Sequence, residues 1–291
     1  MIVDCHCHAG KGDGFTGPWD TDAPLGAYLR RAAAAGIDRT ILLPAFSSDY
    51  GEANRALARI VARAPHRLQA FAMVHAARDR GRIHELVETA VKRYAFRGIK
   101  VHRHDAPINR EVCEAARRFR LPVLYDIGGD TAVLELLSDQ YPDVAFIVPH
   151  LGSFGDDWRA QLGVIDHLVR HPNIHADTSG VRRFDLLVQA VRRAGAHKIL
   201  FGSDGPWLHP GLELAKIDAL QLGPQQRSLV LGGNLLRLIG QTPQARPGRA
   251  DPDRADPTAP TRAASIRPPR SQAGEHGSQA HRPPLPLAPS R

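Results

Sequence analysis

The feature that most constrains this chain is a regular alternation of short apolar runs with amphipathic helical patterns, from residue 2 to residue 220. The near-continuous apolar runs predict strands buried on both faces, and the segments between them repeat apolar residues at helical spacing. The predicted strands are Ile2–Cys5, Thr40–Pro44, Leu68–Val74, Gly98–Val101, Pro122–Tyr125, Val144–Val148, Asn173–Ala176 and Lys198–Phe201. The predicted helices are Pro24–Ala35, Glu52–Ala64, Ile83–Tyr94, Arg110–Phe119, Thr131–Gln140, Trp158–Arg170, Phe184–Ala194 and Leu212–Leu220.

Eight strand–helix units in a row indicate an α/β fold with parallel strands covered by helices. Eight units favour closure into a barrel over an open sheet, and a (β/α)8 barrel needs about 250 residues. No glycine-rich phosphate loop follows the first strand, which disfavours a nucleotide-binding sheet. We therefore predict a (β/α)8 TIM barrel over residues 1–240.

The composition changes at about Gln241. Residues 241–291 hold 11 of the 23 prolines and eight arginines, and apolar residues are sparse. A segment with so little apolar surface cannot bury a core, so it is predicted to be a disordered Pro/Arg-rich tail.

The net charge of +8 raises the question of nucleic acid, but half of the excess lies in the tail, which carries eight arginines against four acidic residues. Because no recognition motif accompanies the charge, we expect no nucleic-acid partner. Apolar runs are also too short to span a membrane. The N-terminus MIVDCHCHAG has no secretory pattern, so a cytoplasmic location is predicted. The sequence is compatible with a homodimer and does not determine the oligomeric state.

Titratable residues end most of the predicted strands, where a TIM barrel carries its active site. Strand by strand, these residues are Asp4, His6 and His8, then His75, then Lys100 and His102, and after them Asp126, His150, Asp177 and Asp204. The pattern predicts an active site at the barrel mouth.

His6 and His8 are two residues apart, so in an extended strand both point to the same face and could bind one metal ion. Cys5 and Cys7 are expected to point the other way, toward the helix layer. The CHCH sequence is therefore not interpreted as one four-ligand zinc site.

Lys100 and His102 repeat this spacing on the fourth strand. A lysine inside a barrel is costly unless it is paired or used chemically, so Lys100 is either a catalytic group or the partner of Asp126 or Asp204. His102 is either a substrate-binding residue or a structural one. His150 is predicted to be a ligand or an acid–base group, and Asp204 could bind metal, accept a proton from water, or both.

Five segments together resemble the amidohydrolase superfamily, and most closely its amidohydrolase-2 group, which includes aminocarboxymuconate semialdehyde decarboxylase and pyrone-dicarboxylate lactonase. They are DCHCH at Asp4–His8, GIKVH at Gly98–His102, PVLYD at Pro122–Asp126, PHLGS at Pro149–Ser153 and FGSDGPW at Phe201–Trp207.

The resemblance implies roles for several residues. His6 and His8 look like the metal ligands of the first strand, and Asp204 like the ligand and proton acceptor of the eighth. His150 looks like the histidine that polarises the substrate or moves a proton. Lys100 takes the position of a lysine that is carboxylated in binuclear relatives.

One departure concerns the fifth strand, where this group usually has histidine and the chain has Asp126. Asp126 is predicted to do one of two things. It either joins His6, His8 and Asp204 around Zn²⁺, in which case the anionic ligand set also suits Mn²⁺, or it pairs with Lys100 in a site with little or no metal.

The leading hypothesis is a metal-dependent hydrolase of an ester, lactone or amide in a small carboxylated substrate. Arg182, Arg183 and Trp207 are predicted to bind that substrate, although the arginines could equally lie outside the site. One alternative is a decarboxylase of an aromatic or muconate-type acid. Another is a barrel that binds a metabolite without catalysis, which is motivated by Asp126.

Overall fold

Parallel strands close into a barrel in the computed structural model, which describes residues 1–14, 22–154 and 157–241. Two hydrogen-bonded runs, β2-β1-β3-β4 and β5 to β10 in order, make up the wall. The nitrogen of Cys5 donates to the oxygen of Phe201 at 3.0 Å and closes one seam, and Phe71 N donates to Leu42 O at 3.1 Å at the other. The strands are β1 (Val3–Lys11), β2 (Asp22–Ala23), β3 (Arg39–Pro44), β4 (Leu68–Ala70), β5 (Ala72–Met73), β6 (Ile99–His102), β7 (Val123–Asp126), β8 (Phe146–Val148), β9 (Ile174–Asp177) and β10 (Ile199–Leu200).

The eight barrel positions are β1, β3, the interrupted pair β4 and β5, and β6 to β10, with β2 added antiparallel to the end of β1. The TIM-barrel prediction is confirmed. All eight predicted strands overlap observed ones.

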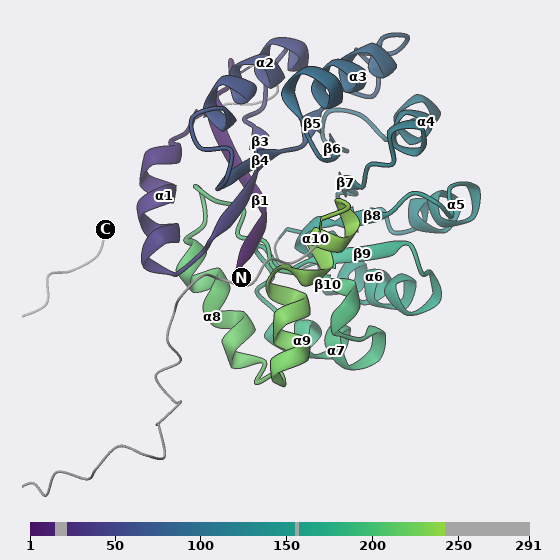
Figure 1. The fold of residues 1–291 in the computed structure, drawn as a ribbon. Helices are drawn as coiled ribbons and strands as arrows, with labels where there is room; N and C mark the ends of the chain where they lie inside the picture. The colour runs from purple at the N-terminus through teal and green to yellow at the C-terminus, as the bar shows by residue number, and fades with distance from the viewer. Residues whose placement is uncertain (15–21, 155–156, 242–291) are drawn as a thin grey trace, which may run out of the picture. The chain divides into compact units, whose positions relative to one another are not determined.

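Helices surround the strands, as Figure 1 shows. They are α1 (Leu25–Ala34), α2 (Tyr50–Val61), α3 (Ile83–Tyr94), α4 (Arg110–Phe119), α5 (Val133–Gln140), α6 (Trp158–Arg170), α7 (Phe184–Ala194) and α8 (Pro210–Ala219). The predicted bounds of α3, α4, α6 and α7 are confirmed. Helix α2 begins two residues earlier than predicted because the Asp49 side chain accepts the backbone N–H of Glu52 and caps the helix there.

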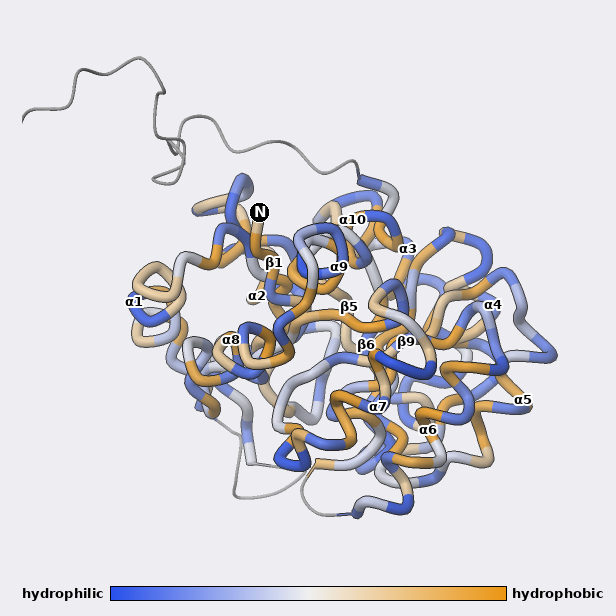
Figure 2. The backbone as a smooth tube through the Cα atoms, turned by 90° about the horizontal axis from the view of Figure 1, so that it is seen from below, coloured by the Kyte–Doolittle hydropathy of each residue, from blue (hydrophilic) through white to orange (hydrophobic). Residues whose placement is uncertain are grey.

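Apolar side chains form two layers on either side of the strands. One cluster joins the outward faces of the strands to the helices, and the other lies inside the barrel. Helix α10 (Asn234–Leu238), which the sequence did not predict, adds Leu235 and Leu236 to the inner cluster. In Figure 2 the stretch labelled β5 is hydrophobic, whereas outer helices such as α4 mix hydrophilic and hydrophobic residues.

Strand β1 contains a bulge that decides where its side chains point. Asp4 pairs with Thr40 and Cys7 with Leu42, so Cys5 and His6 together lie opposite the one residue Ile41. The strand also runs on to Lys11 instead of ending at Cys5.

This bulge corrects the prediction for one cysteine. Cys7 packs in the outer cluster with Tyr28, as expected, but Cys5 packs in the inner cluster with Val3 and Ile41. The extra residue shifts the alternation of the strand, so that Cys5 and His6 both turn inward.

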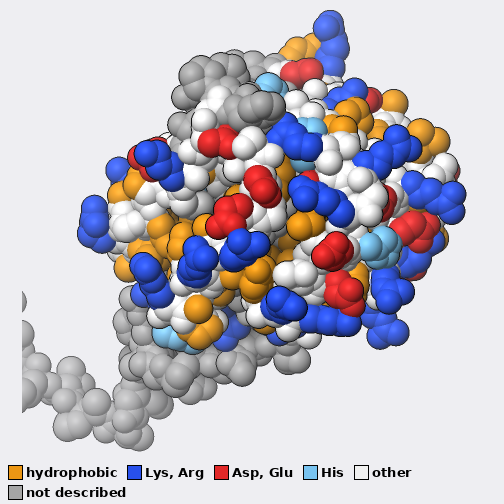
Figure 3. All heavy atoms as spheres, turned by 90° about the horizontal axis from the view of Figure 1, so that it is seen from above, with side chains coloured by type: hydrophobic (Ala, Val, Ile, Leu, Met, Phe, Trp, Pro, Cys, Tyr) orange, Lys and Arg blue, Asp and Glu red, His pale blue; other side chains and the backbone are white. Residues whose placement is uncertain are grey.

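The predicted tail, residues 241–291, lies outside the described residues apart from Gln241. Its disorder and the boundary at residue 240 stay predictions. Within the described part of the chain, no helix has the length and apolar character needed to cross a membrane. On the face in Figure 3, Lys and Arg side chains are interspersed with Asp and Glu rather than gathered into one patch.

Candidate active site at the barrel mouth

A pocket of about 440 Å³ opens where the strands end, and most of the predicted site residues line it. The carboxyl ends of parallel strands meet at one end of a barrel, so residues far apart in sequence come together there. The lining residues are His6, His8, Phe46, Lys100, His102, His104, Asp126, Gly128, His150, Ser153, Phe154, Asp204 and Trp207.

His6 and His8 each have one ring nitrogen held by the protein and the other directed into the pocket. The Nδ1 of His6 lies 2.9 Å from Oδ2 of Asp177, and the Nδ1 of His8 lies 2.7 Å from the Pro44 carbonyl oxygen. Because these partners only accept, each Nδ1 carries the proton and each Nε2 keeps its lone pair. Burial lowers the pKa of His6 to about 4 and the pKa of His8 well below its usual value, so both rings are neutral at pH 7.

Asp204 faces both of these free nitrogens. Its Oδ1 lies 3.5 Å from Nε2 of His6 and 3.8 Å from Nε2 of His8. The ligand atoms of the three residues all lie within 4.8 Å of one another. Two imidazoles and one carboxylate are a donor set typical of catalytic zinc sites, which leave a position open for water or substrate.

Asp204 and His150 are both held in left-handed backbone conformations, with φ of 53° and 58°. Such conformations are unfavourable for residues other than glycine and persist only where the surrounding structure enforces them, often at functional sites. The backbone N–H of Asp204 donates to the His6 carbonyl oxygen at 2.7 Å, and the N–H of His150 donates to Asp177 at 3.0 Å.

Asp177 and Ser179 connect His6 with His150 below the pocket. The Oδ1 of Asp177 accepts from the Ser179 backbone N–H and hydroxyl at 3.0 and 2.6 Å. The Ser179 carbonyl oxygen lies 2.8 Å from Nδ1 of His150, which leaves the Nε2 of His150 free to face the pocket. His6, His150 and Asp177 also converge closely enough to hold an ion, but the Ser179 hydroxyl contacts all three and fills that space.

Asp126 does not join the set of His6, His8 and Asp204. Its Oδ2 lies 3.1 Å from Nε2 of His102 and 3.8 Å from Nε2 of His150. Burial by itself would raise the pKa of Asp126, but His102, His150 and Lys100 together lower it well below its usual value. The Nδ1 of His102 accepts the backbone N–H of His104, so its Nε2–H donates to Asp126.

Lys100 is buried on the floor of the pocket. Burial lowers the pKa of its ammonium, while the carboxylates of Asp126, Asp177 and Asp204 act in the opposite direction. Lys100 therefore lies in a field of several carboxylates instead of forming an ion pair with one of them. The carboxylates around the pocket outnumber this lysine, which makes the site favourable for a bound cation.

Besides His102, the residues predicted to bind substrate are Trp207, Arg182 and Arg183, and these three lie in different places. Trp207 lies at the rim with its ring 4.5 Å from that of His8, and its Nε1 donates to the Asp22 carbonyl oxygen at 3.0 Å. Arg182 and Arg183 are exposed and do not line the pocket; the Arg183 guanidinium binds Asp185 in the first turn of α7 instead.

Several residues at the site were missed by sequence reasoning. The role of Asp177 as the partner of His6 was not predicted, although its position at a strand end had singled it out. Phe46, His104, Ser153 and Phe154 line the pocket from loops, where neither periodicity nor strand ends gave a signal. The rings of Phe46 and His102 meet edge to face at 5.0 Å.

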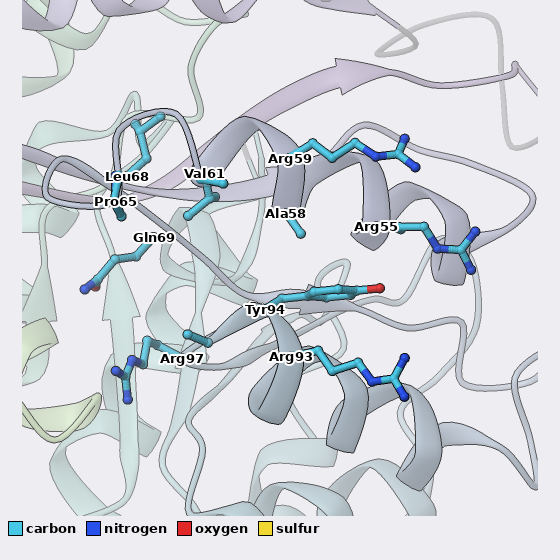
Figure 4. A pocket seen from close by; sticks show the side chains of 12 residues that line it. Arg55, Ala58, Arg59, Val61, Pro65, Leu68, Gln69, Arg93, Tyr94 and Arg97 are labelled. Atoms are coloured by element: carbon cyan, nitrogen blue, oxygen red, sulfur yellow. The ribbon is translucent and has the colours of Figure 1, made fainter.

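A larger cavity of about 610 Å³ lies between α2 and α3, outside the barrel mouth. Figure 4 shows Arg59 and Arg93 on either side of the Tyr94 ring, with Arg55 extending the same way as these two. Among the described residues, its lining contains four arginines and no histidine or carboxylate. It therefore lacks an acid–base pair or a ligand set, and the candidate active site remains the barrel mouth.

A comparison with known protein families identifies the family of this chain. The family model described as Amidohydrolase matches residues 3–241. The chain belongs to the amidohydrolase family. A search of the curated proteins finds no match.

Solved structures similar to this amidohydrolase share its fold at low identity. The 2,6-dihydroxybenzoate decarboxylase from Rhizobium is 19% identical over 82% of this chain and 98% of its own, with a TM-score of 0.64. The dihydroxybenzoic acid decarboxylase from Polaromonas sp. JS666, which holds manganese and the inhibitor 2-nitroresorcinol, is 20% identical over 82% and 96%, with a TM-score of 0.65. A putative 2-pyrone-4,6-dicarboxylic acid hydrolase from Pseudomonas putida is 19% identical over 82% and 97%, with a TM-score of 0.63.

Proposed function

We propose that this amidohydrolase is a metal-dependent hydrolase of an ester, lactone or amide bond in a small carboxylated substrate. The observation that carries the proposal is the convergence of the free Nε2 atoms of His6 and His8 on Oδ1 of Asp204. The opposite ring nitrogens are held by Asp177 and the Pro44 carbonyl, which supports a ligand role, because metal-binding histidines are oriented by such partners.

Zn²⁺ or Mn²⁺ fits this donor set, and manganese is present in a structurally similar decarboxylase. A divalent cation held by His6, His8 and Asp204 would supply Lewis acidity, which lowers the pKa of water and polarises an acyl oxygen. Asp126 is no longer proposed as a ligand, since its carboxylate faces His102 and His150.

The side chains of the pocket would divide the remaining tasks. Asp204 is buried beside the reacting position and accepts the proton that water loses on attack. His150, with Nδ1 held by Ser179, directs its Nε2 toward the acyl oxygen or the leaving group. Lys100 is placed to bind the carboxylate of the substrate, and His102, whose Nε2–H donates to Asp126, lines the same pocket.

A second candidate reaction is the decarboxylation of an aromatic acid. Phe46, Phe154 and Trp207 give the pocket aromatic walls, and about 440 Å³ is enough for one substituted ring. Two of the similar structures are decarboxylases of dihydroxybenzoic acids. In this reaction Asp204 or His150 would protonate the carbon that loses CO₂.

The test uses the purified full-length chain loaded with Zn²⁺ or Mn²⁺ and screened against small carboxylated lactones, esters and amides, and against 2-hydroxybenzoates. Hydrolysis that falls by roughly 10²–10⁴-fold in Asp204→Asn supports the first proposal. Release of CO₂ without hydrolysis products decides for the second. Turnover that is the same in Asp204→Asn and in the unaltered chain refutes both.

A further inference from the structure

A second group of metal-binding side chains lies in the helix layer, between α5 and α6. His167 is in the last turn of α6 and His171 follows that helix directly, so the two are four residues apart on one face. Their rings are stacked with centroids 5.4 Å apart. The Oε2 of Glu135, on α5, lies 3.6 Å from Nδ1 of His167 and 3.3 Å from Nε2 of His171. None of these residues lines the barrel-mouth pocket.

A cationic side chain already contacts two members of this group. The guanidinium of Arg170 lies 3.0 Å from Oε2 of Glu135 and 3.4 Å from Nδ1 of His167. Because a guanidinium can only donate, the Nδ1 of His167 accepts, and its lone pair points to the place where a cation sits.

The burial of the four side chains differs in a way that suits exchange of one cation for another. The side chains of His167 and His171 are only 8% and 11% exposed, whereas those of Glu135 and Arg170 are 45% and 52% exposed. Arg170 can therefore swing into solvent without disturbing the packing of the two helices.

We propose that Glu135, His167 and His171 form a divalent transition-metal site that Arg170 closes when no metal is bound. Two imidazoles and a carboxylate favour Zn²⁺, Cu²⁺ or Ni²⁺ over Mg²⁺ or Ca²⁺. The three ligand atoms lie within 4.8 Å of one another, and tetrahedral zinc with ligands at about 2.0–2.1 Å needs a separation of roughly 3.3 Å, a small adjustment for side chains. Since Glu135 is on a different helix from the histidines, bound metal would tie α5 to α6.

The site is tested by isothermal titration of the full-length, metal-free protein with Ni²⁺. Each of the variants Glu135→Gln and His171→Ala loses one of the three proposed ligands. We expect each variant either to bind one Ni²⁺ ion fewer than the unaltered chain or to bind that ion at least roughly tenfold more weakly. This difference is expected whether or not the barrel mouth also takes up Ni²⁺. His66→Ala, at an exposed histidine between α2 and β4, is the matched control and should leave the titration unchanged.

Arg170→Ala provides the second, opposite arm. It should lower the dissociation constant for Ni²⁺ at the proposed site by roughly two- to fivefold, because the ion no longer has to displace Arg170 from its exposed ion pair with Glu135. Thermal unfolding without metal checks that each variant is folded. The proposal is overturned if folded Glu135→Gln and His171→Ala both titrate like the unaltered chain, or if Arg170→Ala binds no more tightly.

Discussion

Replacing Asp177 by asparagine should weaken metal binding at the barrel mouth although Asp177 is not a proposed ligand. Its Oδ2 receives the Nδ1 proton of His6, and its Oδ1 accepts from the backbone N–H of His150 and from the backbone N–H and hydroxyl of Ser179. An amide has only one oxygen, so it cannot accept on both sides.

The two orientations of the new amide have different costs. With its oxygen toward Ser179, its NH₂ faces Nδ1 of His6, which must then accept, and the proton moves to Nε2, the atom proposed to bind metal. With its oxygen toward His6, the backbone N–H groups of His150 and Ser179 lose their buried acceptor, at about 1–3 kcal/mol each. The first orientation is therefore favoured, and the loss appears in metal affinity.

The expected weakening is about 10- to 100-fold, the usual effect of losing the partner of a ligating histidine, or about 1.4–2.7 kcal/mol. It is measured by competing Asp177→Asn against a chromophoric chelator for Zn²⁺ and Mn²⁺. Asp185→Asn, at an exposed aspartate that pairs with Arg183, is the matched control. A folded Asp177→Asn protein that binds both metals within about twofold of the unaltered chain would refute this reasoning.

Three further outcomes are expected. Removing metal with a chelator should abolish turnover and lower the melting temperature, and Zn²⁺ or Mn²⁺ should restore both, because an ion that binds the native state stabilises it; full activity in metal-free protein would contradict this. Gly152→Ala should destabilise the protein by about 1–3 kcal/mol more than Gly81→Ala, as measured by urea unfolding. Both glycines have positive φ, but only at Gly152 would the added Cβ overlap a side chain, that of Val164 at 2.4 Å. Equal losses of stability in the two variants would count against this explanation. Burial raises the pKa of Asp4 from 3.8 to about 6, so its stabilising contribution is complete below about pH 3.8 and is lost as the pH rises through 6. Relative to the unaltered chain, the free energy of unfolding of Asp4→Asn should therefore rise by up to about 3 kcal/mol between pH 4 and pH 7. A difference between the two proteins that stays constant with pH would show that burial does not destabilise the carboxylate.

Much of the barrel could be predicted because its determinants are local. Apolar runs mark strands buried on both faces, and helical spacing marks the outer layer. In the structure, the side chains of Asn109 and Asp157 cap α4 and α6, whose predicted bounds are confirmed. The meeting of His6, His8, His150 and Asp204 in one pocket was also predictable, because a barrel brings the carboxyl ends of all its strands together.

Other features depended on contacts between distant parts of the chain. The bulge in β1, set by pairing with β3, turned Cys5 inward against the expected alternation. Asp126 lies opposite His102 in the register of β6 and β7, and its carboxylate faces His102 and His150 instead of the proposed ligands.

What the sequence alone determined is thus the barrel and the identities of the strand-end side chains at its mouth, since both follow from short-range periodicity and from the position of each residue in its strand. What only the tertiary structure decided is which nitrogens of His6 and His8 face the pocket, which carboxylate lies beside those nitrogens, and that Arg182 and Arg183 lie outside the pocket. The hydrogen bond between His6 and Asp177, for example, joins residues 171 positions apart. Partners so distant in sequence are chosen by strand register and packing, which no local pattern records.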